Sequence, residues 1–365
     1  MVIELHQLKK KRTGASLSSI SSTSSEELSI PVEPLQKMAP AKLYNELLPL
    51  KLSFEQLKQN GYPFWCSTSS QAVFAATANN KKDWAAPNDF YRKCSRCSKG
   101  FYLNPDGTAN AQKCVYHHRA KWDPLTGKKH LPCCSAKPGP STKGCLVEDR
   151  HVFSQSWEDT LWEFVVSPQA KGKDDHRSNK VFALDCELVH TLNGLEVARV
   201  SLVDMKGKVL LDTFALPVFE VISFNSTFSG VTEKDMESAI SLEACRLQLF
   251  QLINSETLLV GHSLESDLKA LRLVHHNVID TAVLFSIVDP SRSYILKLSL
   301  QNLAKKYLCK DVQSEASGHS SIEDSHTCME LLATRHLFFY CHGVQTNMKF
   351  GGKQLRKKPK KNNKK

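Results

Sequence analysis

The clearest pattern of apolar and polar positions lies between residues 180 and 339, where short apolar runs alternate with segments of helical spacing. Runs rich in Val, Leu and Phe between turn residues predict strands, and apolar residues at i, i+3 and i+4 predict helices. In chain order the elements are strands at 180–188, 196–204 and 208–217, a helix at 241–253, a strand and helix over 256–273, a strand at 277–280, and helices at 298–308 and 320–339. This order predicts an α/β fold with a mixed sheet flanked by helices.

The flanking segments have other compositions. Residues 13–30 are rich in Ser and cannot form a core, whereas 41–65 has helical spacing up to Gly61. Residues 90–151 are rich in Cys and His, which indicates a small module held by metal. We therefore expect a disordered Ser-rich segment (1–40), a short helical segment and linker (41–87), a Cys/His-rich zinc module (88–155), the α/β domain (178–345) and a disordered basic tail (346–365).

Two carboxylates interrupt the first strand, "FALDCEL". Asp185 and Glu187 are two residues apart, so they face the same side of the strand, opposite to Leu184 and Cys186. Burying two like charges side by side costs several kcal/mol, which a divalent cation removes. Hard oxygen ligands favour Mg²⁺ or Mn²⁺. The alternative is that both acids lie at an exposed strand end.

Three later residues strengthen the cation interpretation. Asp267 lies one turn into the helix that follows a buried strand, and His319 precedes Asp324 by five residues where the last long helix begins. These side chains could converge on two cations and a water molecule, with the imidazole accepting the proton of the water. Each residue alone also has a structural interpretation, such as a helix cap or a surface ion pair.

Together these motifs resemble the DEDDh 3′→5′ exonucleases, and more narrowly the RNA exonuclease 1 family. The resemblance is carried by "FALDCEL", "GLEVARVSLVD", "TFSGVTEKDM", "VGHSLESDLKAL", "VIDTAVLF" and "GHSSIEDSHTCMEL", in chain order over about residues 180–335. It implies an RNase H-like fold and hydrolysis of RNA from a free 3′ end, with release of nucleoside 5′-monophosphates. Leu188 departs from the usual Met of the family, and "SIVDP" departs from its usual continuation.

The resemblance also implies roles for single residues. Asp185, Glu187 and Asp324 would hold the first metal ion, Asp185 and Asp267 would hold the second, and His319 would be the general base. Phe228 and His262 are candidates for substrate binding, by stacking on the terminal base and by orienting a ligand. A core aromatic residue and a hydrogen-bonded structural histidine are the alternatives. Asp280 either supports the site or caps the next helix.

Within residues 94–151, the six cysteines and two of the four histidines predict two zinc sites of three Cys and one His each. The simplest pairing joins Cys94, Cys97, Cys114 and His117 in one site, and Cys133, Cys134, Cys145 and His151 in the other. An interleaved pairing stays open, and His118 is an alternative to His117. The array resembles the Cys/His-rich segment that precedes the nuclease domain in the RNA exonuclease 1 family.

Charge separates the chain into an acidic block and basic flanks. The net charge is +11, yet residues 180–335 contain 14 Lys and Arg against 20 Asp and Glu. Basic flanks suit a polyanionic partner, and the runs "KKKR" (9–12) and "LRKKPKKNNKK" (355–365) resemble nuclear import signals. The N-terminus lacks the apolar core of a signal peptide, and no apolar run reaches the roughly 18 residues of a membrane span. We expect an intracellular, nuclear protein that does not enter a membrane.

The leading hypothesis is a two-metal 3′→5′ exoribonuclease with an N-terminal zinc module. One alternative is a zinc-dependent adaptor for RNA or protein whose nuclease domain is idle. A second alternative is an exonuclease that acts on DNA, because contacts to the 2′-hydroxyl have no motif that can be read from sequence.

Overall fold

The computed structural model describes residues 33–75, 90–104, 111–118, 120–123, 128–139, 143–153, 161, 163–289, 294–313 and 318–342. The Ser-rich segment and both terminal basic runs lie outside these residues.

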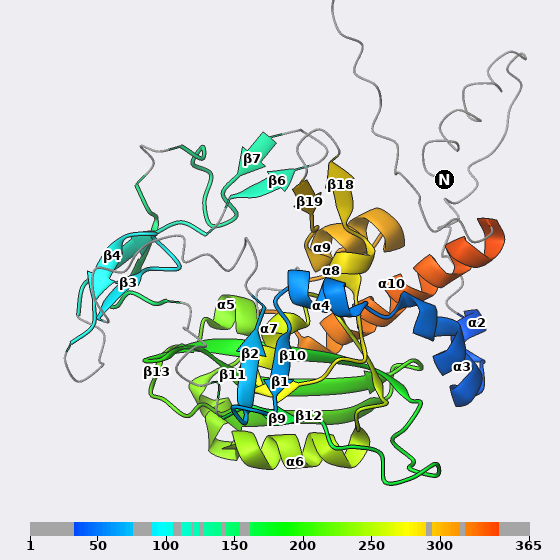
Figure 1. Ribbon diagram of the computed structural model, residues 1–365. Coiled ribbons are helices and arrows are strands. Elements are labelled where there is room, and N and C mark those ends of the chain that lie inside the picture. Colours follow the sequence, from blue (N-terminus) through cyan, green and yellow to red (C-terminus); the bar gives the residue numbers. More distant parts are fainter. Residues whose placement is uncertain are drawn as a thin grey trace, which may run out of the picture. The chain divides into compact units, whose positions relative to one another are not determined.

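A mixed sheet forms the centre of the α/β domain, with the strand order β14–β12–β11–β10–β15–β17 (Figure 1). Strand β11 is antiparallel to both β10 and β12, whereas β14 pairs parallel to β12, and β15 and β17 continue the sheet parallel to β10. Tight turns can join the first three strands, whereas parallel strands need crossover segments. The bounds are β10 (Val181–Thr191), β11 (Gly194–Asp204), β12 (Val209–Leu216), β13 (Val221–Ser223), β14 (Ile240–Ser241), β15 (Leu258–Gly261) and β17 (Val278–Asp280). The predicted mixed sheet is confirmed.

Helices pack on both faces of this sheet. Leu184 and Cys186 of β10 point into a cluster with α6 and α7, and Val181 and Ala183 point into a cluster with α9 and α10. Figure 1 shows α6 along the face opposite to α10. The helices are α5 (Ser226–Ser229), α6 (Leu242–Leu252), α7 (Glu265–Ala270), α8 (Thr281–Leu284), α9 (Leu300–Leu303) and α10 (Ser321–His342), with 3₁₀ turn η4 (Glu233–Ser238) and π-helical turn η5 (Ala304–Leu308).

The N-terminal segment packs against the α/β domain. Its helical spacing forms two helices separated by a turn that contains Pro49, because proline removes a backbone donor and clashes with the preceding helical turn. Leu47, Leu57 and Tyr62 are buried against the sheet and its helices. The Tyr62 hydroxyl donates to Asp280 Oδ2 at 2.8 Å. The elements are α2 (Glu33–Gln36), α3 (Pro40–Leu47), η1 (Leu48–Leu50), α4 (Phe54–Gln59), β1 (Pro63–Cys66) and β2 (Gln71–Phe74).

The Cys/His-rich module is built from two-stranded pieces with a very small core. Phe101 and Tyr116 are buried there with Cys94, Cys114 and Phe153. These two aromatic residues therefore serve the core, whereas Tyr102 is 47% exposed. The strand pairs are β3 (Tyr91–Lys93) with β4 (Gly100–Tyr102), β5 (Cys114–Tyr116) with β8 (Leu146–Glu148), and β6 (Lys121–Asp123) with β7 (Lys128–His130).

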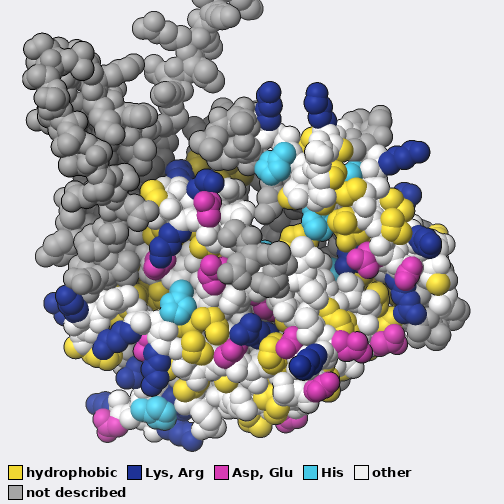
Figure 2. Space-filling model, turned by 180° about the vertical axis from the view of Figure 1, so that it is seen from behind, with side chains coloured by type: hydrophobic (Ala, Val, Ile, Leu, Met, Phe, Trp, Pro, Cys, Tyr) yellow, Lys and Arg dark blue, Asp and Glu magenta, His cyan; other side chains and the backbone are white. Residues whose placement is uncertain are grey.

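Two further strand pairs are β9 (Val165–Val166) with β16 (Leu273–Val274), and β18 (Ile287–Asp289) with β19 (Tyr294–Leu296). Within the described residues, no helix has the length and apolar character needed to cross a bilayer. Figure 2 shows Lys and Arg side chains interspersed with Asp and Glu over one face of the molecule.

A buried histidine makes the stability of the fold depend on pH. His275 Nδ1 lies 2.8 Å from Ser167 Oγ and Nε2 lies 2.9 Å from the Thr257 carbonyl, and burial lowers the pKa of His275 to about 4. Because the unfolded histidine titrates near 6.5, the unfolded state binds more protons between these values, and stability falls as pH falls through this range. From pH 7 to pH 5 this histidine should cost about 2 kcal/mol of unfolding free energy.

Urea denaturation of the wild type and of His275→Gln at both pH values measures this contribution. The variant should be less stable than the wild type at pH 7. Between pH 7 and pH 5 its unfolding free energy should fall by about 2 kcal/mol less than that of the wild type. Equal losses in the two proteins would contradict the assignment.

Candidate active site and Cys/His groups

Asp185 and Glu187 lie on the face of β10 that is covered by α10. They continue the alternation of Val181 and Ala183, whose side chains pack in the α10 cluster. Glu187 is 6% exposed. The strand therefore places both carboxylates under the N-terminal end of α10.

Asp267 reaches β10 from α7, the helix that follows the neighbouring strand β15. Strand β15 runs parallel to β10, and α7 follows it after a short turn. Asp267 Oδ1 accepts a hydrogen bond from the backbone N–H of Cys186 at 2.8 Å. This bond ties the first turn of α7 to β10 at Cys186, the residue between Asp185 and Glu187 in the sequence.

Asp324 comes from the first turn of α10. Its Oδ2 accepts a hydrogen bond of 2.7 Å from Gln313 Nε2, and the Ser321 hydroxyl lies 2.7 Å from Ser201 Oγ on β11. The N-terminus of α10 is therefore tied to the sheet, and Asp324 is held close to Asp185 and Glu187.

Burial raises the pKa of all four carboxyl groups, and neighbouring carboxylates of the site add to this effect at Asp185 and Glu187. Burial raises the pKa of Asp185 well above its usual value, with contributions from Asp267, Asp324 and Glu187. Burial also raises the pKa of Glu187 to about 9, with a contribution from Asp324 and opposition from the Arg199 guanidinium. For Asp324, burial raises the pKa to about 6 against the hydrogen bond from Gln313.

The donor set fits divalent cations with hard-ligand preference. Glu187 Oε1 and Asp324 Oδ1 are buried and have no hydrogen-bond partner. Buried carboxylates without partners are costly, and a cation coordinated by oxygen satisfies them. In the described part of the chain, the groups with all ligand atoms within 4.8 Å of one another consist of Cys and His, so the carboxylates are more widely spaced than that.

His319 stands in the loop that enters α10. Its backbone N–H donates to the Phe228 carbonyl at 2.9 Å, and the centroids of the two rings are 5.9 Å apart in an edge-to-face arrangement. The preceding Gly318 has a φ of +100°, and a Cβ there would lie 2.3 Å from the Ser226 carbonyl oxygen. Only glycine lets this loop pass so close to α5.

A pocket of about 280 Å³ opens beside these residues. Its lining includes Glu187, Phe228 and His319, together with Leu188 and His190. The pocket thus brings three of the predicted site residues together. His262 does not line this pocket: its Nδ1 lies 3.0 Å from the Thr281 hydroxyl, and burial lowers its pKa.

Asp280 acts as a cap. Its Oδ1 accepts from the backbone N–H groups of Ser263 and Ala282, at 2.9 and 2.8 Å, and the second of these bonds caps α8.

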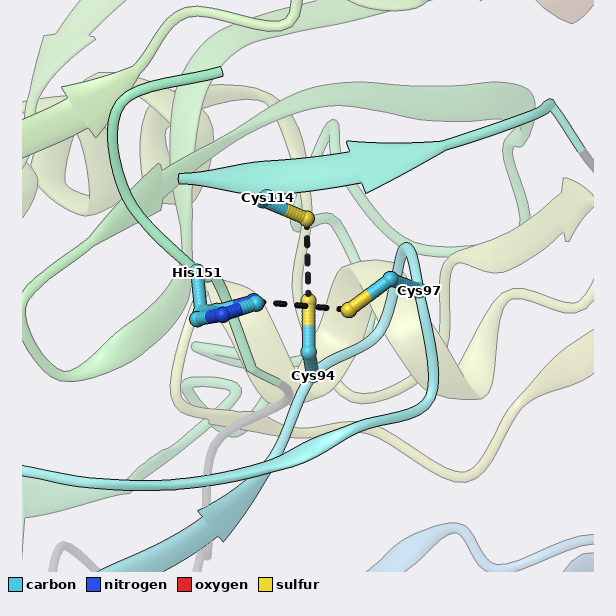
Figure 3. A group of neighbouring side chains, drawn as sticks. All are labelled: Cys94, Cys97, Cys114 and His151. Atoms are coloured by element: carbon cyan, nitrogen blue, oxygen red, sulfur yellow. Dashed lines mark hydrogen bonds between the residues drawn. The ribbon is translucent and has the colours of Figure 1, made fainter. Parts of the chain in front are cut away.

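The eight predicted ligands of the module converge in two groups of four, with the histidines exchanged relative to the simplest pairing. Figure 3 shows the first group, Cys94, Cys97, Cys114 and His151, with the side chains pointing toward one another. The second group contains His117, Cys133, Cys134 and Cys145. The pairing is therefore the interleaved one.

Distances within both groups match the edges of a zinc tetrahedron. Zinc bonds of about 2.3 Å to sulfur and 2.0 Å to nitrogen imply S···S edges of about 3.8 Å and S···N edges of about 3.5 Å. Cys94 Sγ lies 3.6 Å from Cys114 Sγ, and Cys97 Sγ lies 3.4 Å from His151 Nδ1. Burial opposes ionisation of Cys94, but backbone N–H groups outweigh it and lower its pKa to about 6.

Curated proteins with this sequence pattern are named as exonucleases. The GOR exonuclease of Pan troglodytes is 36% identical over 301 residues, 81% of this chain and 42% of that protein. RNA exonuclease 1 homolog of Homo sapiens is 36% identical over 313 residues, 84% of this chain and 25% of that protein. RNA exonuclease 3 of Schizosaccharomyces pombe is 36% identical over 257 residues, 67% of this chain and 44% of that protein.

The chain belongs to the RNA exonuclease 1 family. It spans less than half the length of these three relatives. No family model matches the sequence. Among solved structures, the Pan2 catalytic unit of Neurospora crassa, which contains protease and nuclease domains, is similar with a TM-score of 0.41 and 22% identity, over 59% of this chain and 39% of that chain.

Several residues of the site were not predicted from the family motifs. Gln313 supports Asp324 from a loop with no recognisable pattern, and His190 lines the pocket from within a strand. Gly318 could have been recognised from the sequence, because a glycine directly before the predicted general base His319 suggests a tight loop. Arg96 lies between two metal-ligand cysteines, and only the three-dimensional structure reveals its contact with β13.

A neutral replacement of Glu187 tests the electrostatic cost of the site. In buffer without added Mg²⁺, Glu187→Gln should increase the unfolding free energy by about 1 kcal/mol or more, because an amide removes one of the repelling carboxylates. Millimolar Mg²⁺ should then stabilise the variant less than the wild type. Thermal unfolding with and without Mg²⁺ provides the measurement.

The matched control is Glu243→Gln on the exposed side of α6. This variant should change neither the unfolding free energy without Mg²⁺ nor the stabilisation by Mg²⁺. A Mg²⁺ response in Glu187→Gln equal to that of the wild type would contradict a role in cation binding.

Proposed function

We propose that this chain is a 3′→5′ exoribonuclease that removes nucleoside 5′-monophosphates from RNA with a free 3′ end. The observation that carries the proposal is the gathering of three buried carboxylates, Glu187, Asp267 and Asp324, around the half-buried Asp185, beside a pocket that both Glu187 and His319 line. Names of the relatives, which are RNA exonucleases, favour RNA over DNA as the polymer.

The carboxylates would hold two Mg²⁺ or Mn²⁺ ions. Asp185, Glu187 and Asp324 form one ligand set, and Asp185 with Asp267 forms the other. Two such ions would stabilise the negative charge that develops on the phosphate. The hydrogen bonds from Cys186 and Gln313 keep the carboxylates of Asp267 and Asp324 in place, and Asp324 Oδ1 has no hydrogen-bond partner and could serve this purpose.

His319 would act as the general base. The neutral imidazole accepts a proton from water as the water oxygen forms a bond to the terminal phosphorus. The bond between phosphorus and the 3′ oxygen of the preceding nucleotide breaks, and this oxygen takes a proton from solvent to become the new 3′-hydroxyl of the shortened RNA. The released nucleotide keeps the phosphate as a 5′-monophosphate. The hydrogen bond from the His319 backbone N–H to the Phe228 carbonyl holds the proposed general base beside the pocket.

Pocket size and lining suit one unpaired nucleotide. A volume of about 280 Å³ is near the lower limit for a small-molecule site, about 300 Å³, and is too small for a base pair. Phe228 provides an aromatic ring for stacking, which serves any base. These features favour a single-stranded 3′ end as the substrate.

An idle adaptor is the second candidate, and the burial of the acids argues against it. Carboxylates that lower stability have no use in a domain that only binds a partner, because apolar or amide replacements would fold better. Two buried oxygens of the site without a hydrogen-bond partner, Glu187 Oε1 and Asp324 Oδ1, support the same conclusion.

Catalysis is tested with 5′-labelled and 3′-labelled single-stranded RNA in Mg²⁺. The wild type should shorten the first substrate stepwise and release labelled mononucleotide from the second. Asp185→Asn should reduce the rate to below about 1%, because both ions lose a ligand. His319→Ala should reduce kcat by about 10²- to 10⁴-fold, the usual contribution of a general base.

Asp311→Asn is the matched control, since Asp311 is exposed and pairs with Lys305 away from the pocket. Full activity of Asp185→Asn would refute the assignment. RNA binding by a wild-type protein that leaves the RNA intact would favour the adaptor, and faster degradation of DNA than of RNA would favour the other polymer.

The Cys/His groups would each hold one Zn²⁺. Thiolate and imidazole ligands select zinc over magnesium, and the small core of the module is insufficient to hold its fold alone. Purified protein should contain two zinc ions per chain.

The interleaved pairing predicts a difference between two double variants. Cys97→Ser with His151→Ala removes two ligands from one group, so one tightly bound zinc should remain. Cys97→Ser with His117→Ala removes one ligand from each group, so a mild chelator should extract both ions. Zinc content before and after chelation distinguishes the two double variants. Retention of one zinc by the variant that lacks Cys97 and His117, and loss of both by the other, would favour the simple pairing.

A further inference from the structure

The second Cys/His group is directly connected to the nuclease pocket through His118. The neighbouring histidines point to different partners: His117 Nδ1 lies 3.6 Å from the sulfur atoms of Cys133 and Cys134, whereas the His118 ring packs on Phe228. The His118 backbone N–H also donates to Cys133 Sγ at 3.3 Å. His118 is therefore held by the group without being one of its ligands.

The contact between His118 and Phe228 is a close edge-to-face pair. The ring centroids are 4.8 Å apart and the planes are inclined by 65°. On its other side Phe228 packs against His319 and accepts a hydrogen bond from its backbone. A continuous series of contacts thus runs from the second Cys/His group through two rings to the proposed base.

The first Cys/His group also contacts the segment of the α/β domain that leads to Phe228, through Arg96. Arg96, between Cys94 and Cys97, donates from Nη2 to Ser223 Oγ on β13 at 2.7 Å, and its side chain is 7% exposed. Ser223 Oγ also accepts from the backbone N–H of Asn225, which begins α5. Both groups therefore converge on the β13–α5 segment that carries Phe228.

We propose that the Cys/His module completes the binding site for the 3′-terminal nucleotide, and that His118 is the positioning residue that holds Phe228 for stacking on the terminal base. This inference rests on the proposed exonuclease function. A ring packed against both His118 and His319 keeps one orientation, which avoids the entropy cost of ordering it when RNA binds.

Stacking is measured with an RNA whose 3′-terminal base is 2-aminopurine, whose fluorescence falls when an aromatic ring stacks on it. The protein is the full chain with Asp185→Asn, which blocks cleavage. Adding His118→Ala should weaken binding by roughly two- to ten-fold, the effect of losing one aromatic pair, and should reduce the quenching. His118→Phe keeps the edge-to-face pair and should restore both.

His130→Ala is the matched control, because His130 is an exposed histidine of the same module on β7. It should bind and quench like the parent protein. Zinc content of His118→Ala should stay at the parent value, since His118 is not in either ligand group. Loss of zinc in this variant would mean that His118 acts only through the metal group, and would overturn the inference.

A double-mutant cycle gives a second readout. Phe228→Ala should abolish the quenching, and His118→Ala added to it should have no further effect on binding, because His118 acts through Phe228. Additive losses would overturn the inference. In the cleavage-competent chain, His118→Ala should raise KM by the same roughly two- to ten-fold and change kcat less.

These experiments distinguish failure of the proposed exonuclease function from failure of the proposed role of His118. A wild-type chain that neither shortens RNA nor binds the fluorescent oligonucleotide would remove the proposed function itself. A wild-type chain that does both, with unchanged quenching and KM in His118→Ala, would overturn only the role of His118.

Discussion

The cost of burying carboxylates is the constraint on which the rest of the α/β domain depends. Burial raises the pKa of Asp185, Glu187 and Asp324, and neighbouring carboxylates add to this effect at Asp185 and Glu187. The sheet and α10 keep these residues together because the apolar residues of both elements form one cluster. Hydrophobic burial over many residues, at about 25 cal/mol per Å², outweighs a local cost of several kcal/mol. The fold therefore accepts an unfavourable local contribution at the site, which a bound divalent cation would reduce.

The same logic explains why so many polar contacts lie around the carboxylates. The backbone N–H of Cys186 fixes Asp267, and the Ser201–Ser321 contact fixes the start of α10. From the N-terminal segment, Tyr62 donates to Asp280, the residue that caps α8 and binds the turn after β15. Such bonds to buried charged groups each contribute about 1.5–3 kcal/mol, and they also set the angle at which each helix meets the sheet. A segment distant in sequence thus contributes to the geometry beneath the carboxylates.

Local patterns predicted the strands, the helices and the order of the acids, because each of these is written in a few neighbouring residues. The alternation that puts Asp185 and Glu187 on one face is a property of any strand. Contacts between distant segments have no such local signal. The exchange of His117 and His151 between the Cys/His groups follows from the pairing of β5 with β8, which places residues 114 and 148 side by side. Gln313 is a similar case, since nothing near it in the sequence indicates that its amide supports Asp324.

Cysteines occur in both halves of the molecule, yet only those of the module are suited to bind a soft metal. Cys186 lies between Asp185 and Glu187, and Cys328 lies one helical turn after Asp324. Burial, with the nearby carboxylates, raises the pKa of both thiols well above the usual value, so they stay protonated and bind zinc poorly. In the module, backbone N–H groups lower the pKa of Cys94 to about 6, whereas burial raises the pKa of Cys114 and Cys145. Within the described residues, the feature that sets the module cysteines apart is their grouping, since each lies in a set of three Cys and one His whose ligand atoms are within 4.8 Å of one another. Such sulfur-rich groups suit a soft metal, whereas the carboxylates suit a hard cation.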